Sequence, residues 1–431
     1  MSNPGFETRS VRAGERPDPD TGACATPIHQ TTSYVFPDAD TAADRYALAA
    51  PGDVYSRISN PTVRTLERRL ASLESGVEAV ATASGMAALD AATLVLADPG
   101  SNIVSSSALY GGTTTYFSTI AARRSIEPRF VEPLDYEKYE AAIDEDTAFV
   151  HFETIGNPSL VTPDIERVAS IAHDRDVPLL VDNTFATPYL CRPLAHGADL
   201  VWESTTKWLH GGGTTLGGVL IDGGDFEWDP DRHSELAGSN PAYDDITFAR
   251  DFEAAPVAAA ARYRALRSLG SGQSPFDAWQ TLQGLASFPA RMDRHCDHAA
   301  IVAEFLDGHP DVAWVSYPGL ESHPTHETAS RYLDGGFGGV ITFGLVGGFE
   351  PGKRVCEETD LASFLANIGD ARTLIIHPAS TTHGHLSERE RIESGVEPDL
   401  VRLSVGLESP ADILSDLDRA VEIATRDTSN Q

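Results

Sequence analysis

The chain has 431 residues, and its 64 acidic and 32 basic side chains give a formal net charge of −32 at pH 7. Such a charge repels nucleic-acid phosphates and anionic lipid head groups, so neither is an expected partner. Hydrophobic residues make up 41% of the sequence, which favours a folded globular protein over a disordered one. The acidic residues are spread along the chain, and only three lysines occur (Lys138, Lys207 and Lys353). We therefore expect a protein adapted to high salt, where ions screen self-repulsion.

The sequence shows no sign of export or membrane insertion. No apolar run approaches the roughly 18 residues that span a membrane. The N-terminal segment 1–20 lacks the apolar core of a signal peptide. The four cysteines are scattered without a Cys-x-x-Cys pair, which argues against a disulfide framework or a structural zinc site. These features predict a cytoplasmic protein.

The first part of the chain reads as an arm followed by a regular alternation of elements. Residues 1–65 are rich in Pro, Asp and Thr and predict an extended arm with short helices, and a helix follows over 63–73. From residue 77 onward, apolar strands alternate with helices. We expect strands at 77–82, 102–105, 129–131, 147–152, 178–181, 200–203 and 216–221, and helices at 87–96, 113–122, 136–143 and 165–173. This order predicts an α/β fold with a mostly parallel sheet covered by helices on both faces.

The second half is less regular. Residues 225–260 are acidic and show little hydrophobic periodicity, which predicts an insertion. A long helix is expected over 275–306, with a kink at Pro289. Strands at 340–345, 373–376 and 401–405 predict a second, smaller α/β unit. The predicted division is therefore an N-terminal arm (1–65), a large cofactor-binding domain (66–288) and a C-terminal substrate domain (289–431).

Several polar residues fall at predicted strand ends, where ligands bind in parallel sheets. Ser84, Asp182 and Ser204 are placed there, and Lys207 follows Ser204 by three residues. A lysine beside hydroxyls and glycines suits an amine that forms a Schiff base next to a bound phosphate, or else is an ordinary lysine in a polar turn. The Ser84-Gly85 turn suits a phosphate at a helix N-terminus, or is a plain turn. Asp182 ends a buried apolar strand and needs a cationic or N–H partner, which is either a protonated pyridine nitrogen or else a helix terminus or an arginine.

A series of short motifs decides between these alternatives. They are Tyr55-Ser-Arg57 with Asn60-Pro61-Thr62, Ser84-Gly85-Met86, Leu109-Tyr110-Gly111, Glu153-Thr154 with Asn157-Pro158, Val181-Asp182-Asn183-Thr184, Ser204-Thr205-Thr206-Lys207, Tyr317-Pro318-Gly319-Leu320, Gly336-Phe337-Gly338-Gly339, His377-Pro378-Ala379-Ser380-Thr381-Thr382-His383 and Arg402-Leu403-Ser404-Val405-Gly406. Any one alone is a weak signal, but their joint order is specific. Over nearly its whole length the chain resembles the Cys/Met metabolism family of pyridoxal 5'-phosphate (PLP) enzymes, which have fold type I.

The resemblance implies roles for individual residues. Lys207 would hold PLP covalently and carry protons, and Asp182 would pair with the pyridine nitrogen. Tyr110 would stack on the ring and act in catalysis. The phosphate would be held by Gly85, Met86, Ser204 and Thr206, together with Tyr55 and Arg57 of a neighbouring subunit. The substrate carboxylate would be bound by Arg402, with Ser380 and Asn157 nearby. The site therefore implies a homo-oligomer, with a dimer as the catalytic unit and a tetramer as the expected assembly.

Within the family, three features favour an O-acetylhomoserine sulfhydrylase. They are the extra length around 225–270, the segment 265–285, and the run from Gly369 into the histidine motif at 377–383. The expected reaction is PLP-dependent γ-replacement, which converts O-acetyl-L-homoserine and sulfide to L-homocysteine and acetate in methionine biosynthesis. Cystathionine γ-synthase, cystathionine γ-lyase and O-succinylhomoserine sulfhydrylase remain alternatives. One departure from the family pattern is the order His210-Gly211-Gly212-Gly213 after the lysine.

Two groups of side chains could indicate a metal site, namely His323, His326 and Glu327, and His377, His383 and His385. Neither group has a second set of ligands, and the family that the chain resembles uses no metal. We therefore expect these residues to have structural or surface roles, and no metal is expected.

Overall fold

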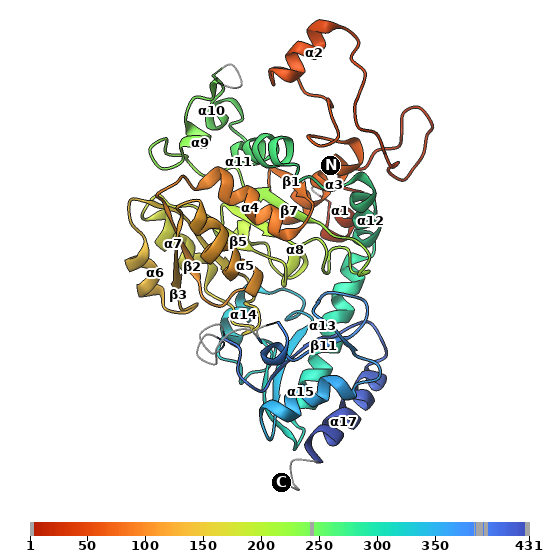
Figure 1. The fold of residues 1–431 in the computed structure, drawn as a ribbon. Coiled ribbons are helices and arrows are strands. Elements are labelled where there is room, and N and C mark those ends of the chain that lie inside the picture. Colours follow the sequence, from red (N-terminus) through yellow and green to blue (C-terminus); the bar gives the residue numbers. More distant parts are fainter. Residues whose placement is uncertain (1–3, 242–244, 383, 385–390, 392–394, 427–431) are drawn as a thin grey trace.

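The computed structural model describes residues 4–241, 245–382, 384, 391 and 395–426 (Figure 1). A seven-stranded sheet forms the larger body, with the strand order β1-β7-β6-β5-β4-β2-β3. All neighbouring strands are parallel except β7, which runs antiparallel to both β1 and β6. The strands are β1 (Glu78–Thr82), β2 (Asn102–Ser106), β3 (Glu127–Val131), β4 (Thr147–Glu153), β5 (Leu179–Asp182), β6 (Leu200–Glu203) and β7 (Gly218–Asp222). The expected mostly parallel sheet is confirmed.

Alternate residues of the central strands supply two separate cores, because successive strand side chains point to opposite faces. Val181 and Val201 belong to one buried cluster, which includes residues of α3 (Pro61–Glu74) and α7 (Ile165–His173). Leu180 and Leu200 belong to the other cluster, with α4 (Gly85–Leu96) and α11 (Pro256–Ala261). Helices therefore cover both faces of the sheet. The remaining helices of this body include α5 (Gly111–Thr115), α6 (Tyr136–Ala142) and α8 (Thr187–Leu190).

Two helix predictions need correction. The expected helix at 113–122 is α5 continued by a π-helical segment, Tyr116–Ala121. The expected long helix at 275–306 is two helices, α12 (Pro275–Leu285) and α13 (Phe288–Asp307). Pro289 lies in the first turn of α13 and not at a kink, because there its missing N–H leaves no hydrogen bond unmade.

The C-terminal part contains a five-stranded sheet with the order β10-β11-β12-β9-β8. Its pairs are antiparallel except β10 with β11. Strands β9 (Val340–Leu345), β11 (Leu374–Ile376) and β12 (Leu400–Ser404) match the expected strands, whereas β8 (Val312–Ser316) and β10 (Ser363–Phe364) were not predicted. Helices α14 (His326–Tyr332), α15 (Phe349–Glu358) and α17 (Pro410–Arg426) complete this part. The domain limits at 65 and 288 stay predictions.

The arm begins with α1 (Phe6–Arg12), whose Phe6 ring packs against Tyr189 and Phe288. Further along, α2 (Ala39–Tyr46) projects from the body at the end of an extended segment (Figure 1). The segment 225–260 contains the short helices α9 (Ser234–Ala237) and α10 (Phe248–Asp251) before α11.

The described residues also bear on membrane insertion and on disulfide bonding. No helix among them is long and apolar enough to cross a membrane. All four cysteines are free thiols, of which Cys24 is exposed and Cys191, Cys296 and Cys356 are buried.

Candidate active site

A pocket of about 250 Å³ opens at the carboxyl ends of the strands in the large sheet. It is shared by the large sheet, the N-terminus of α4 and segments of the C-terminal part. Its lining residues are Ser84, Gly85, Met86, Tyr110, Glu153, Ile155, Asn157, Asp182, Thr184, Phe185, Trp202, Ser204, Thr206, Lys207, Leu216, Ala366, Asn367, Ile368 and Arg402. Nine of the twelve predicted site residues therefore meet in one cavity, and only Tyr55, Arg57 and Ser380 lie outside it.

One end of the pocket is built as an anion site. Ser84 caps α4, since its side-chain oxygen accepts a hydrogen bond from the Ala87 N–H at 3.1 Å. The N–H groups of Gly85 and Met86 lie in the first helical turn, where no intrahelical acceptor exists, and the helix dipole adds positive potential. A Cβ on Gly85 would lie 2.9 Å from the Ser204 Cβ, so only glycine fits between these two elements. This end of the pocket therefore suits a phosphate.

Asp182 ends β5 at another wall of the pocket and is buried. Its carboxylate accepts the Thr184 N–H at 2.9 Å, and no arginine, lysine or histidine of the described chain forms a salt bridge with it. Burial raises the pKa of Asp182 above the usual carboxyl range. A buried carboxylate in this condition needs a cationic partner, which a protonated pyridine nitrogen supplies.

Glu153, at the end of β4, also lines the pocket, and the sequence predicts no role for it. Its two side-chain oxygens accept the Tyr110 N–H at 2.5 Å and the Asn157 N–H at 2.9 Å. One buried carboxyl group thus fixes the backbone of two predicted ligand-binding residues. Burial, and then the neighbouring Asp182, raise the pKa of Glu153.

Lys207 lies in the turn after β6, where its ammonium donates a hydrogen bond to the side-chain oxygen of Asn367. Burial, and to a smaller degree Arg402, lower the pKa of Lys207 to about 8. Asn367 is a site residue that the sequence did not reveal, because it lies in a loop between β10 and β11 without any periodic pattern. A lysine with a lowered pKa is the form of the residue that acts as a nucleophile or base at neutral pH.

Arg402 reaches the pocket from β12, and one guanidinium nitrogen donates a hydrogen bond to the Asn157 side-chain oxygen at 3.1 Å. Burial lowers the pKa of Arg402 to about 10. Within the described residues no carboxylate forms a salt bridge with Arg402. Its guanidinium N–H groups therefore remain available to the carboxylate of a substrate.

The loop after Lys207 closes on itself. The Gly211 N–H donates to the Lys207 carbonyl at 2.7 Å, and Gly211 and Gly213 adopt positive φ angles of 74° and 64°. His210 bonds Thr214 at 2.9 Å through Nε2. The His210 side chain therefore contacts the loop that contains it. The residue order His210-Gly211-Gly212-Gly213 is compatible with an intact turn at Lys207.

The three predicted residues outside the pocket have other contacts. Tyr55 is exposed, and the Arg57 guanidinium lies 4.9 Å from its ring centre. Arg57 also donates from Nε to the Arg267 carbonyl at 2.9 Å. The Ser380 hydroxyl contacts Nδ1 of His377 at 2.8 Å.

The candidate metal groups are engaged in hydrogen bonds. Nδ1 of His326 contacts the Pro318 carbonyl at 2.8 Å, and Nε2 of His377 contacts the Pro398 carbonyl at 2.9 Å. Across the described chain no group of three or more His, Cys, Asp or Glu side chains could hold a metal. His383 and His385 lie outside the described residues.

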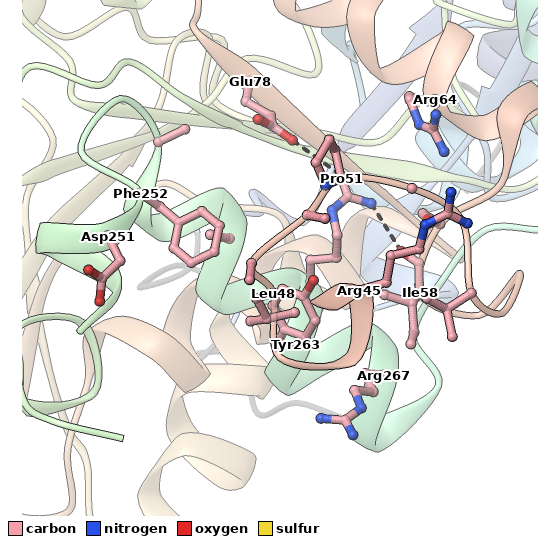
Figure 2. A pocket seen from close by; sticks show the side chains of 18 of the residues that line it. Arg45, Leu48, Pro51, Ile58, Arg64, Glu78, Asp251, Phe252, Tyr263 and Arg267 are labelled. Atoms are coloured by element: carbon pink, nitrogen blue, oxygen red, sulfur yellow. Dashed lines mark hydrogen bonds and ion pairs between the residues drawn. The ribbon is translucent and has the colours of Figure 1, made fainter. Parts of the chain in front are cut away.

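A larger cavity of about 640 Å³ lies elsewhere, between arm residues 45–68 and residues 251–267 (Figure 2). Arginines of the arm and of the 262–267 segment surround it, among them Arg45, Arg64 and Arg267. None of the predicted site residues lines it, although its lining includes Val54 and Ile58, which flank Tyr55 and Arg57. The chemistry described above belongs to the smaller pocket.

Known proteins resemble this chain over nearly its whole length. The sequence model described as "Cys/Met metabolism PLP-dependent enzyme" matches residues 7–422. The chain belongs to this family. A homocysteine synthase of Schizosaccharomyces pombe is 46% identical over 422 residues, covering 97% of this chain and 98% of the relative. An O-acetyl-L-homoserine sulfhydrylase of Leptospira meyeri is 45% identical, covering 96% of each chain.

A solved structure of a Campylobacter jejuni protein superposes with a TM-score of 0.94 at 37% identity, covering 97% of this chain and all of that one. It is described as an O-acetylhomoserine (thiol)-lyase and contains N'-pyridoxyl-lysine-5'-monophosphate. Family membership makes this chain a PLP-dependent enzyme of fold type I. The helix N-terminus at Gly85, the buried Asp182 without a salt bridge among the described residues, and the lysine of lowered pKa fit that cofactor.

Proposed function

We propose that this protein converts O-acetyl-L-homoserine and sulfide to L-homocysteine and acetate. The observation that carries the proposal is that Lys207, Asp182 and Arg402 line one pocket, and that neither Lys207 nor Arg402 forms a salt bridge with a carboxylate among the described residues. The near full-length likeness to enzymes named for homocysteine synthesis and O-acetylhomoserine sulfhydrylation supports the choice of substrates.

Each residue then has a defined task. Lys207 would hold the cofactor covalently, and its free amine would take a proton from the substrate α-carbon. Asp182 would hold the pyridine nitrogen, and the α4 N-terminus with Ser204 and Thr206 would hold the phosphate. PLP, when bound, would supply an electron sink. Tyr110 would cover the ring.

The substrate is oriented by its carboxylate. Arg402 binds that group through two parallel hydrogen bonds, and Asn157 holds the guanidinium in place. The γ-carbon carries the acetoxy leaving group, and the flexible amine of Lys207 would serve more than one proton transfer. The C–O bond at the γ-carbon breaks, acetate leaves, and a C–S bond forms with sulfide.

The site needs a second copy of the chain. Tyr55 and Arg57 are exposed on the arm and lie outside their own pocket, which supports a homodimer in which they bind the phosphate of the neighbouring subunit. We place the enzyme in the cytoplasm, where the buried free thiols stay reduced. A tetramer of two such dimers is the proposed assembly.

A product assay tests the proposal. The purified, PLP-loaded enzyme is supplied with O-acetyl- or O-succinyl-L-homoserine, and separately with sulfide, cysteine or methanethiol. Homocysteine should form fastest from the acetyl ester and sulfide. Faster turnover of the succinyl ester, or cystathionine as the main product with cysteine, would assign one of the alternative activities.

A further inference from the structure

A second pair of carboxyl groups lies behind the cofactor pocket, on the opposite face of the large sheet. Glu74 is the last residue of α3, and Glu203 is the last residue of β6. Both side chains are completely buried, with relative exposures of 0%. The residue before Glu203, Trp202, is the strand partner of Asp182, so Glu203 points away from the pocket beside it.

The two carboxyl groups interact with each other. One oxygen of Glu74 accepts the Asn183 side-chain amide at 2.6 Å. The other oxygen of Glu74 and both oxygens of Glu203 are buried without a hydrogen-bond donor among the described residues. Two carboxylates cannot both remain ionised at such a contact, whereas a proton between them supplies the missing donor.

The surrounding charges lead to the same conclusion. The charge of Asp182, from the neighbouring strand β5, also acts on Glu203, and the nearby Cys191 thiol is buried. Among the described residues, Arg192 is the cation whose charge acts on Glu74. Two buried carboxyl groups with a third acidic neighbour and one arginine favour retention of a proton by the pair.

The pair is coupled to the pocket through Asn183, which follows Asp182 directly. The Asn183 amide also donates to the Cys191 carbonyl at 2.9 Å, and its oxygen accepts from the Thr154 hydroxyl at 2.8 Å. The turn that carries Asp182 is thus held by Glu74. Of the two glutamates, Glu203 is the one whose carboxyl group interacts with the charge of Asp182.

We propose that Glu74 and Glu203 share one proton and act as positioning residues, with Glu74 holding the Asn183 turn and the neutral Glu203 keeping a further negative charge away from Asp182. The shared proton follows from this chain's own packing. Its effect on PLP rests on the proposed function, in which Asp182 binds the pyridine nitrogen.

Infrared spectroscopy of the protein without cofactor at pH 8 tests whether Glu74 and Glu203 share a proton. The C=O stretch of a protonated carboxyl group should be present in the wild type and reduced in Glu203→Gln. The double variant Glu74→Gln/Glu203→Gln should lose no more of this band than Glu203→Gln alone, because only one proton is present. A twofold larger loss in the double variant, or no loss in either variant, would overturn the proposal.

The effect on the pocket is tested by the dissociation constant of PLP. Glu203→Gln carries the same charge as the protonated acid and should bind PLP as the wild type does. Asn183→Ala, which releases the Asp182 turn, should weaken binding. Weakening of Glu203→Gln by more than about tenfold, the scale of a hydrogen bond to a charged group, would mean that Glu203 acts as an anion. Neither readout depends on homocysteine formation, so a failure of the proposed reaction is recognised separately.

Discussion

Lys207 and Arg402 are two cations on the wall of one pocket, and neither forms a salt bridge with a carboxylate in the described part of the chain. Burial of Lys207, and to a smaller degree the charge of Arg402, disfavour the charged form of the lysine, whose pKa falls to about 8. The neutral amine is the form that captures an aldehyde cofactor. Arg402, with a pKa of about 10, stays charged at neutral pH, so it remains ready for a carboxylate while Lys207 reacts.

The lowered pKa predicts how cofactor capture depends on pH. Below pH 8 the Lys207 amine is mostly protonated, so the rate of covalent PLP capture by the cofactor-free protein should rise about tenfold per pH unit and level off above about pH 8. Stopped-flow absorbance measures this rate. Arg402→Ala removes a nearby positive charge and should move the plateau to higher pH, whereas Arg402→Lys should not. A rate that does not change between pH 6 and 9 would contradict the assignment.

Gly85 tests the phosphate end of the pocket. A Cβ there would lie 2.9 Å from the Cβ of Ser204 and 3.1 Å from its Cα, so Gly85→Ala must push α4 from β6. We expect a loss of about 1–3 kcal/mol in the free energy of unfolding, as for other overpacked sites, together with weaker PLP binding. Gly308→Ala is the matched control, because its nearest contacts lie at 3.6 Å or more and its φ is −86°. Equal effects of the two substitutions would argue against a tight α4–β6 contact.

Arg57 tests whether the sites are shared between subunits. Lys207→Ala and Arg57→Ala should each be nearly inactive alone. When the two variants are co-expressed, half of the dimers are mixed, and each mixed dimer contains one site with both residues. Activity should then recover to about a quarter of the wild-type value, as the two-fold symmetry of a dimer requires. Absence of recovery, with mixed dimers present, would place Arg57 in the site of its own chain.

The charge of −32 predicts a dependence of stability on salt. Self-repulsion among 64 acidic residues is screened as the Debye length shrinks to about 3 Å at 1 M salt. The melting temperature should therefore rise with KCl, and the same rise in NaCl would separate screening from a specific potassium effect. A protein that melts at the same temperature with and without salt would show that its surface needs no screening.

Much of the site could be predicted because it depends on one topological rule. Ser84, Asp182 and Ser204 follow strands of one sheet, and carboxyl ends of parallel strands meet at one edge. The structure adds what this rule does not contain. Asn367 comes from a loop of the other sheet, and the contact that brings it to Lys207 leaves no local pattern.

Two further differences have physical causes. The direction of β7 is invisible in its apolar pattern, since parallel and antiparallel buried strands have similar composition. The sequence predicts a kink where α12 ends and α13 begins, because a proline inside an apolar pattern marks either a kink or a new helix start. The Glu74–Glu203 pair lies on residues 129 positions apart in the sequence, so no local pattern reveals it.

The most direct test uses the fact that the chain has only three lysines. The PLP-loaded protein is reduced with borohydride, digested and mapped by mass spectrometry, with Lys207→Ala treated in parallel. The pyridoxyl phosphate mass should appear on the peptide that contains Lys207 and be absent from the variant. A label on Lys138 or Lys353, or none on Lys207, would contradict the account.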